Sequence, residues 1–301
     1  MHSLVALAAA IAALPAPGLP ASFIPVRRGP EGGSVWIGRI PNREVTSDHR
    51  ASAVYLPPRF SLDRRYPVVY LLHGMRGAPS SFYASLRIAN VIDRLIASHR
   101  VRPFIAVMPV AGPMVNPDSG EWAGVWEDYL VHDVVPWVDS HLPTIPTQRG
   151  RAVAGLCAGG YGAIDIGLRH PSLFGTLEAW DGYFSPFRDG PFVHASPADI
   201  AAHTPTLLVA RDAADLRREG VRVFLSTGGN HGVVLSRWTY SFAGELTRLG
   251  VQHAVWLLPR SDGSRFWRSQ LPVALAYAAD GSSPARARGS TRSAASRRAR
   301  T

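Results

Sequence analysis

The sequence contains no lysine, and it contains a single cysteine, Cys157. One cysteine excludes an intrachain disulfide framework and any metal site built from cysteines alone. The phosphate-binding Walker A motif and the glycine fingerprint of dinucleotide-binding folds are both missing. No two histidines have the spacing of a zinc-binding HExxH helix, so we expect no metal site and no cofactor.

All 32 basic residues are arginines, and with 22 acidic residues they give a net charge of +10. Six of these arginines lie in residues 281–301, which contain no acid, so residues 1–280 carry only +4. This modest charge and a tail without aromatic residues argue against a nucleic-acid partner. We expect residues 281–301 to be a disordered, solvated tail, with contact to an anionic surface as the alternative.

The N-terminus begins with an apolar run over residues 4–14, followed by prolines and small residues. This run is too short to span a bilayer but suits the hydrophobic region of a secretory signal. We therefore expect a signal peptide over residues 1–21, cleavage near Ala21, and a secreted or cell-surface protein. The segment before the run has no arginine, so a misassigned start or a cytoplasmic protein remains the alternative.

Short apolar runs alternate with longer helical stretches along the rest of the chain, and 46% of all residues in the sequence are hydrophobic. The expected strands are residues 35–40, 51–56, 67–72, 104–108, 152–156, 177–180, 221–225 and 254–258. The expected helices are residues 88–98, 126–141, 160–170 and 236–249. This alternation predicts one α/β domain over residues 22–280 with a mostly parallel sheet.

The segment Gly155-Leu156-Cys157-Ala158-Gly159 lies between an expected strand and an expected helix. A nucleophile flanked by glycines at such a turn is the nucleophile elbow of α/β hydrolases, where glycines allow a sharp bend. The elbow of that pattern carries serine, and here it carries Cys157. A helix N-terminus favours the thiolate form of cysteine. The alternative is that Cys157 is only a small buried apolar residue.

Residues 34–278 resemble the esterase D/antigen 85 family of α/β hydrolases, which includes feruloyl esterases, S-formylglutathione esterases and mycolyltransferases. The segments that carry the resemblance are residues 70–76 (YLLHGMR), 169–174 (RHPSLF), 179–184 (AWDGYF) and 266–271 (FWRSQL), besides the elbow. The resemblance implies an α/β-hydrolase fold with a mostly parallel central sheet and helices on both faces. It also implies an oxyanion hole formed by the backbone N–H groups of Met75 and Ala158.

The chain departs from the family's catalytic pattern at three places. Cys157 replaces the serine, Asn230 and His231 stand where an acid is expected, and Asp262 stands close to the expected histidine. A triad is defined by geometry and not by chain order. One interpretation is therefore a Cys157–His231–Asp262 triad, and another has His231 oriented by Asp181. A degenerate, inactive site is the third.

Two functions follow from these interpretations. The first is a carboxylic-ester or thioester hydrolase, or an acyltransferase-like protein, that forms an acyl-enzyme on Cys157. Its substrate would be an acyl ester of a small molecule, lipid or glycan. The alternative is a catalytically degenerate member of the fold that binds glycan, lipid or cell-wall polymer.

The candidate binding residues are Arg76, Trp122, Trp126 and Tyr183. In the degenerate alternative Trp122, Trp126, Tyr183 and also Trp180 would form the binding surface. We expect Glu127, close to Trp126, to belong to a solvated acidic helix start.

Overall fold

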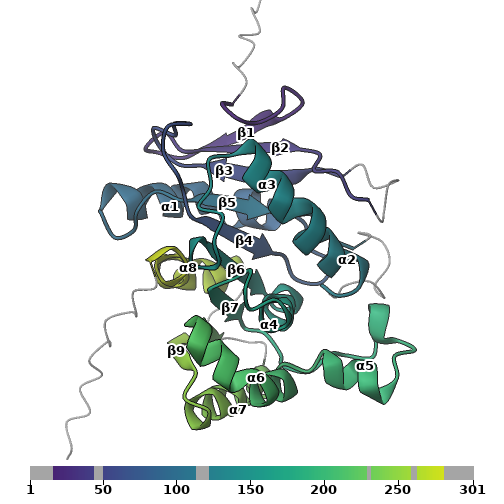
Figure 1. Ribbon diagram of the computed structural model, residues 1–301. Coiled ribbons are helices and arrows are strands. Elements are labelled where there is room, and N and C mark those ends of the chain that lie inside the picture. Colours follow the sequence, from purple (N-terminus) through teal and green to yellow (C-terminus); the bar gives the residue numbers. More distant parts are fainter. Residues whose placement is uncertain (1–15, 44–49, 113–121, 229–231, 259–262, 281–301) are drawn as a thin grey trace, which may run out of the picture.

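The computed structural model describes residues 16–43, 50–112, 122–228, 232–258 and 263–280. Its centre is a nine-stranded sheet in the order β1-β2-β3-β5-β4-β6-β7-β8-β9 (Figure 1). The strands are β1 (Ile24–Arg28), β2 (Ser34–Gly38), β3 (Ser52–Leu56), β4 (Val68–Leu72), β5 (Ile105–Met108), β6 (Arg151–Leu156), β7 (Thr176–Trp180), β8 (Arg222–Gly228) and β9 (Gln252–Leu258).

The sheet has an antiparallel part and a parallel part. The pairs β1–β2, β2–β3 and β3–β5 are antiparallel, whereas β5, β4, β6, β7, β8 and β9 run parallel to one another. All residues of β4, β5, β6 and β7 are buried. Strands covered on both faces lack polar alternation, which is why these segments read as continuous apolar runs.

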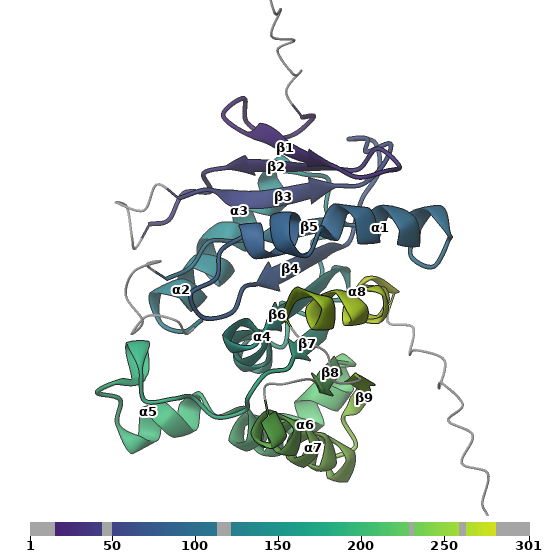
Figure 2. The ribbon, with the colours of Figure 1, turned by 180° about the vertical axis from the view of Figure 1, so that it is seen from behind.

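Helices cover both faces of the sheet. They are α1 (Ile88–Ala97), α2 (Val125–Asp128), α3 (Val135–His141), α4 (Ala158–Arg169), α5 (Pro197–Ala202), α6 (Pro205–Glu219), α7 (Gly232–Arg248) and α8 (Gly263–Asp280), with π-helical turns η1 (Ser81–Ser85) and η3 (Tyr129–Val134) and 3₁₀ turns η4 (Gln148–Gly150) and η5 (Gly190–Phe192). Helices α2, α3, α4 and α6 lie on the face seen in Figure 1, and α1 and α8 lie on the face seen in Figure 2. The mostly parallel α/β architecture is therefore confirmed.

The helix expected over residues 126–141 is continuous but irregular, with η3 between α2 and α3. Pro136 lies in the first turn of α3. Proline has no N–H to donate, so a regular α-helical ladder cannot run through this position. The π-helical turn η3 directly precedes α3 and interrupts the regular ladder just before the proline.

The two ends of the chain are only partly described. Ala16 and Leu19 are buried in the main core, and a side chain at Gly18 would meet the carbonyl oxygen of His141 at 2.7 Å. Ala16 and Leu19 of the expected signal segment thus pack on the body, whereas residues 1–15 and 281–301 lie outside the described residues. Export, cleavage near Ala21 and the solvated tail stay predictions. Among the described residues, no helix is both long and apolar enough to cross a membrane.

Candidate active site

Cys157 lies at the turn between β6 and α4, where the motif places it, and it is the N-cap of α4. Its backbone has φ 52° and ψ −113°. A non-glycine residue at positive φ costs about 1–3 kcal/mol and persists only where its surroundings hold it. Here the Cys157 N–H donates to the carbonyl oxygen of Trp180 at 3.0 Å, and the Tyr161 N–H donates to the Cys157 carbonyl at 3.0 Å.

The glycines of the elbow are required by close backbone approach. A Cβ at Gly155 would lie 2.1 Å from the carbonyl oxygen of Gly159. A Cβ at Gly159 would lie 2.0 Å from the carbonyl oxygen of Leu72 at the end of β4. Both positions exclude a side chain, because real Cβ atoms do not come within 3.0 Å of such neighbours. The first turn of α4 therefore rests directly on β4 and β6.

The expected oxyanion segment packs against the elbow. A Cβ at Gly74 would meet the Leu156 carbonyl oxygen at 3.1 Å and the Cys157 Cβ at 3.5 Å. The residue after Gly74 is Met75, and Ala158 is the first residue of α4. The first N–H groups of a helix have no partner inside the helix. The fold thus brings the segment that carries the Met75 N–H to the turn that carries the Ala158 N–H.

His73 supports this segment and does not act as a base. Its Nδ1 lies 3.0 Å from the Gly74 carbonyl oxygen, and its Nε2 accepts the Ala111 N–H at 3.3 Å. Burial lowers the pKa of His73 to about 4, against the raising effect of the Gly74 hydrogen bond. His73 is therefore neutral near pH 7, with both ring nitrogens engaged.

The four aromatic residues expected to form a binding surface have buried side chains: Trp122, Trp126, Trp180 and Tyr183. The Trp122 indole N–H donates to the His73 carbonyl at 2.9 Å, and Tyr183 stacks on Tyr161 with ring centroids 4.9 Å apart. These contacts make the rings part of the support beneath the elbow. Arg76, the fourth candidate binding residue, is exposed at φ 56°.

Asp181 lies at the end of β7, is 1% exposed and has φ 53°. Its N–H donates to the Ser226 carbonyl at 2.8 Å, and its Oδ1 accepts the Thr227 hydroxyl at 3.0 Å. These bonds tie Asp181 to the end of β8. Thr227, one of its two partners there, lies four residues before His231 in the chain. His231 and Asp262 themselves lie outside the described residues.

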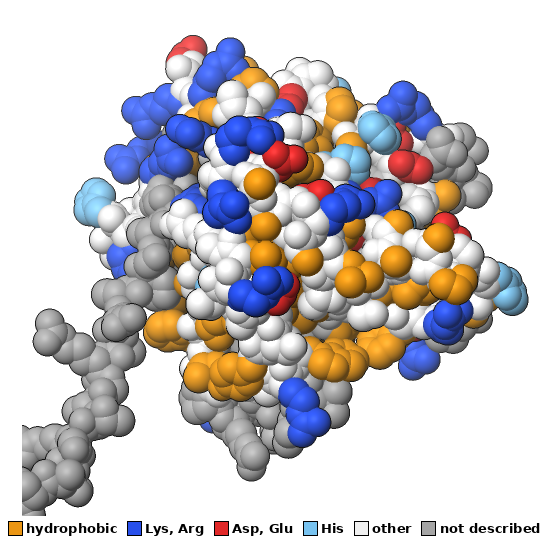
Figure 3. Space-filling model, turned by 60° about the horizontal axis from the view of Figure 1, so that its bottom comes forward, with side chains coloured by type: hydrophobic (Ala, Val, Ile, Leu, Met, Phe, Trp, Pro, Cys, Tyr) orange, Lys and Arg blue, Asp and Glu red, His pale blue; other side chains and the backbone are white. Residues whose placement is uncertain are grey.

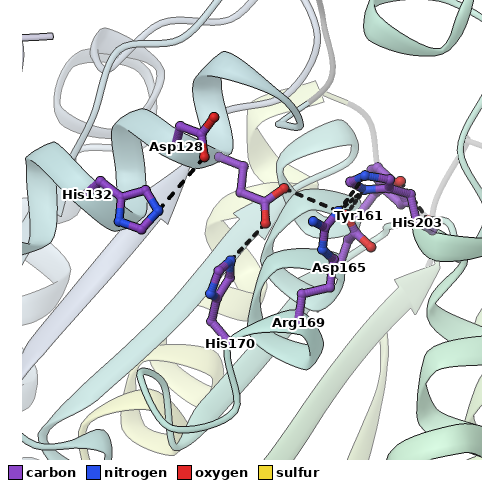
Figure 4. Close-up of polar contacts among 8 residues, drawn as sticks. Asp128, His132, Tyr161, Asp165, Arg169, His170 and His203 are labelled. Atoms are coloured by element: carbon purple, nitrogen blue, oxygen red, sulfur yellow. Dashed lines mark hydrogen bonds and ion pairs between the residues drawn. The ribbon is translucent and has the colours of Figure 1, made fainter. Parts of the chain in front are cut away.

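Glu127 is buried and paired, so the expectation of a solvated helix start is wrong for this residue. His170 Nε2 lies 2.8 Å from Glu127 Oε1, and Arg169 Nη1 lies 3.4 Å from Oε2 (Figure 4). Burial acts to raise the pKa of Glu127, but the His170 hydrogen bond and the charge of Arg169 outweigh it and lower the pKa. These contacts tie α2 to the end of α4.

Asp165 and His203 form a second pair, which was not predicted from the sequence. Asp165 is fully buried on α4, and its Oδ2 accepts His203 Nδ1 at 2.8 Å. Burial raises the pKa of Asp165, and the His203 hydrogen bond opposes that rise. The signal was available in the sequence, because Asp165 is the only charged residue between Cys157 and Arg169.

Ligand atoms of Glu127, Asp165 and His203 lie within 4.8 Å of one another, close enough to share a metal ion. Arg169 already provides a cation there, because its Nη1 lies 3.4 Å from Glu127 and also donates to His203 Nε2. The guanidinium and a metal would compete for the same groups. The negative charge of this cluster is thus already balanced by the guanidinium of Arg169.

Comparisons with known proteins identify relatives of this chain. The family model described as "Putative esterase" matches residues 44–277. A Xylanibacter ruminicola endo-1,4-beta-xylanase/feruloyl esterase is 31% identical over 140 residues, which are 44% of this chain and 19% of that protein. An esterase of Mycobacterium tuberculosis is 34% identical over 137 residues, which are 44% of this chain and 28% of that protein. The matches thus span less than a third of either relative.

Solved structures show the same fold. A ferulic acid esterase superposes with a TM-score of 0.71 at 23% identity, covering 82% of this chain and 98% of that one. An S-formylglutathione hydrolase from Agrobacterium tumefaciens gives 0.67 at 16% identity, covering 86% and 98%. The α/β-hydrolase fold is therefore confirmed. Together with the family match, these findings show that the chain belongs to the putative esterase family of α/β hydrolases.

Proposed function

We propose that this protein cleaves carboxylic esters or thioesters, or transfers their acyl group, through an acyl-enzyme on Cys157. The observation that carries the proposal is the strained elbow, with Cys157 at φ 52° directly at the N-terminus of α4. That position exposes a nucleophile to a helix dipole that favours the thiolate. Family membership supports ester hydrolysis as the reaction class.

The chemistry balances as two acyl transfers. The Cys157 thiolate attacks the substrate carbonyl carbon, and the developing oxyanion is held by the N–H groups of Met75 and Ala158. Collapse breaks the bond from the carbonyl carbon to the leaving oxygen of an ester, or to the leaving sulfur of a thioester. The leaving alkoxide or thiolate takes a proton, and a thioester remains on Cys157. Water, or an acceptor alcohol or thiol, then attacks the thioester and returns the thiolate.

We propose His231 as the group that carries the proton, oriented by Asp181 or Asp262. The buried Asp181 supports the first partner, because its bond to Thr227 places its carboxyl group beside the strand that leads to His231. The substrate is an acyl ester of a small molecule, lipid or glycan. Since one relative is named a feruloyl esterase, aromatic acyl esters are the first substrates to assay.

The test is acylation of the only thiol in the chain. Native protein is mixed with an activated thioester or with 4-nitrophenyl acetate, quenched in acid, and weighed intact by mass spectrometry. We expect an acyl adduct on Cys157 that forms at least about a hundredfold faster than on the same protein unfolded in denaturant. Cys157→Ala should abolish the adduct.

Variants of the base distinguish the alternatives. His231→Ala should slow acylation by about a hundredfold, and Asp181→Asn and Asp262→Asn separately show which acid orients the base. A native thiol that reacts no faster than the unfolded one contradicts the proposal. That result would favour a non-catalytic member of the fold.

A further inference from the structure

Residues 185–204, which we call the arm, connect β7 to α6 and include η5 and α5. The arm extends from the body beside the end of the sheet (Figure 1). Only Pro186, Phe192 and Thr204 of its residues are buried, and no residue of α5 is. Burial of apolar surface is the main force that fixes a segment, so packing alone holds the arm weakly.

The arm nevertheless reaches the elbow. Phe192 belongs to an apolar cluster with Ala158, Tyr161 and Tyr183, against which Cys157 packs. Ala195 and Ile200 of the arm pack against the same cluster. The arm therefore adds apolar groups to the same cluster against which the proposed nucleophile packs.

A polar anchor fixes the end of the arm to α4. The Tyr161 hydroxyl donates to the His203 carbonyl at 2.8 Å, and His203 Nδ1 lies 2.8 Å from Asp165 Oδ2. The Arg169 guanidinium lies against the same imidazole, with its Nη1 in contact with both ring nitrogens of His203. Tyr161, Asp165 and Arg169 are spaced four residues apart on α4, and Tyr161 lies four residues after Cys157. The three side chains therefore lie along one side of the helix, in line with Cys157.

Asp165 depends on this contact. It is fully buried, and its Oδ1 accepts no hydrogen bond among the described residues. A buried carboxylate with one oxygen unpaired is costly, so the bond from His203 is worth more than a surface contact. The aromatic ring of Phe192 packs edge-on to His203 at 5.0 Å, which joins the polar anchor to the apolar cluster.

We propose that Asp165 and His203 are positioning residues that hold the arm as the apolar wall for the acyl group at Cys157. This inference rests on the proposed function for the acyl group, whereas the anchoring of the arm can be tested without it. Exposed apolar side chains of the arm, Phe187 and Val193, extend the wall outward. Hydrophobic side chains also gather between arginines on the face turned forward in Figure 3.

The first readout is trypsin cleavage after Arg188, an exposed arginine within the arm. Cleavage after Arg94 in α1, on the other face of the sheet, reports global opening in the same digest. Local cleavage follows the population of the open form, so His203→Ala and Asp165→Ala should each raise the Arg188 rate about tenfold relative to Arg94. The double variant should add little, because both changes remove one contact.

Two controls separate anchoring from general damage. His203→Asn keeps an N–H donor near the position of Nδ1 and should stay within about threefold of wild type. Glu245→Gln removes a surface pair with Arg248 on α7 and should leave the Arg188 rate unchanged. An unchanged Arg188 rate in both His203→Ala and Asp165→Ala would overturn the anchor.

The second readout is acyl preference. In His203→Ala, kcat/KM for an aromatic acyl ester should fall about tenfold through KM, while kcat/KM for the acetate ester of the same alcohol should change less than about twofold. Equal losses for both esters would overturn the wall. If wild type hydrolyses neither ester, the proposed function fails, and the trypsin readout still decides whether the anchor exists.

Discussion

The elbow and the arm both contact the surroundings of Cys157, but different forces hold them. The elbow is fixed by backbone packing so close that Gly155 and Gly159 have no room for a methyl group. The arm is largely exposed, and hydrogen bonds to Tyr161 and Asp165 tie its end to α4. This difference shows that close packing in the core of the fold positions the proposed nucleophile, whereas hydrogen bonds hold the proposed wall in place.

The largest effect is expected from a side chain added at the elbow. Gly155→Ala forces a methyl group against the Gly159 carbonyl and should lower the free energy of unfolding by more than about 3 kcal/mol. Chemical denaturation measures it. Gly244→Ala is the matched control, because a Cβ there meets nothing within 4 Å, and it should stabilise the protein by about 0.5–1 kcal/mol. Similar midpoints for the two variants would contradict the comparison.

A smaller effect is expected from pH at the segment beside the elbow. The pKa of His73 is about 4 in the folded protein and 6.5 in its unperturbed state. As the pH falls, His73 takes up a proton in the unfolded chain before it does so in the folded protein. The folding stability that is present above pH 6.5 is therefore lost as the pH falls toward 4. The loss amounts to roughly 3 kcal/mol.

The variant that isolates this effect is His73→Gln. Between pH 7 and pH 4 the free energy of unfolding should fall in both proteins, but the fall in His73→Gln should be smaller than that in wild type by roughly 3 kcal/mol. Denaturation curves at pH 7, 5.5 and 4 make the measurement. Parallel losses in the two proteins would show that His73 is not held neutral by the fold.

The smallest global effect is expected in the arm. Ser196 caps α5 by accepting the Asp199 N–H at 3.2 Å, and the Asp199 carboxylate accepts the Ser196 N–H at 3.1 Å. Ser196→Ala removes a cap worth about 1 kcal/mol, yet α5 buries no residue, so the global free energy should change by less than about 0.5 kcal/mol.

The loss should appear locally instead. Amide hydrogen exchange over α5 should accelerate about fivefold in Ser196→Ala, while exchange in α4 stays unchanged. Faster exchange in both helices would mean that the arm and the elbow form one cooperative unit and are not held by separate forces.

Much of the fold could be predicted because its signals are local. The parallel strands are buried on both faces, so each appears as an apolar run, and the glycine-flanked elbow motif lies within one short segment. Helix α6 was not predicted, although Pro205 at its start and Gly220 at φ 68° after its end are ordinary helix boundaries. Strand β1 was missed because its burial is low and its partner is an antiparallel neighbour at the sheet edge.

The sequence by itself determined the α/β class, the position of Cys157 at a strand–helix turn, and the segment expected to carry the Met75 N–H. Only the tertiary structure decided which candidate residues are exposed, burying Trp122 and Tyr183 beneath the elbow. It alone brought His203 to Asp165, which is 38 residues away in the chain. The physical reason is that periodicity and turn chemistry act between neighbours, whereas burial and pairing of charges depend on segments that meet only when the sheet is assembled.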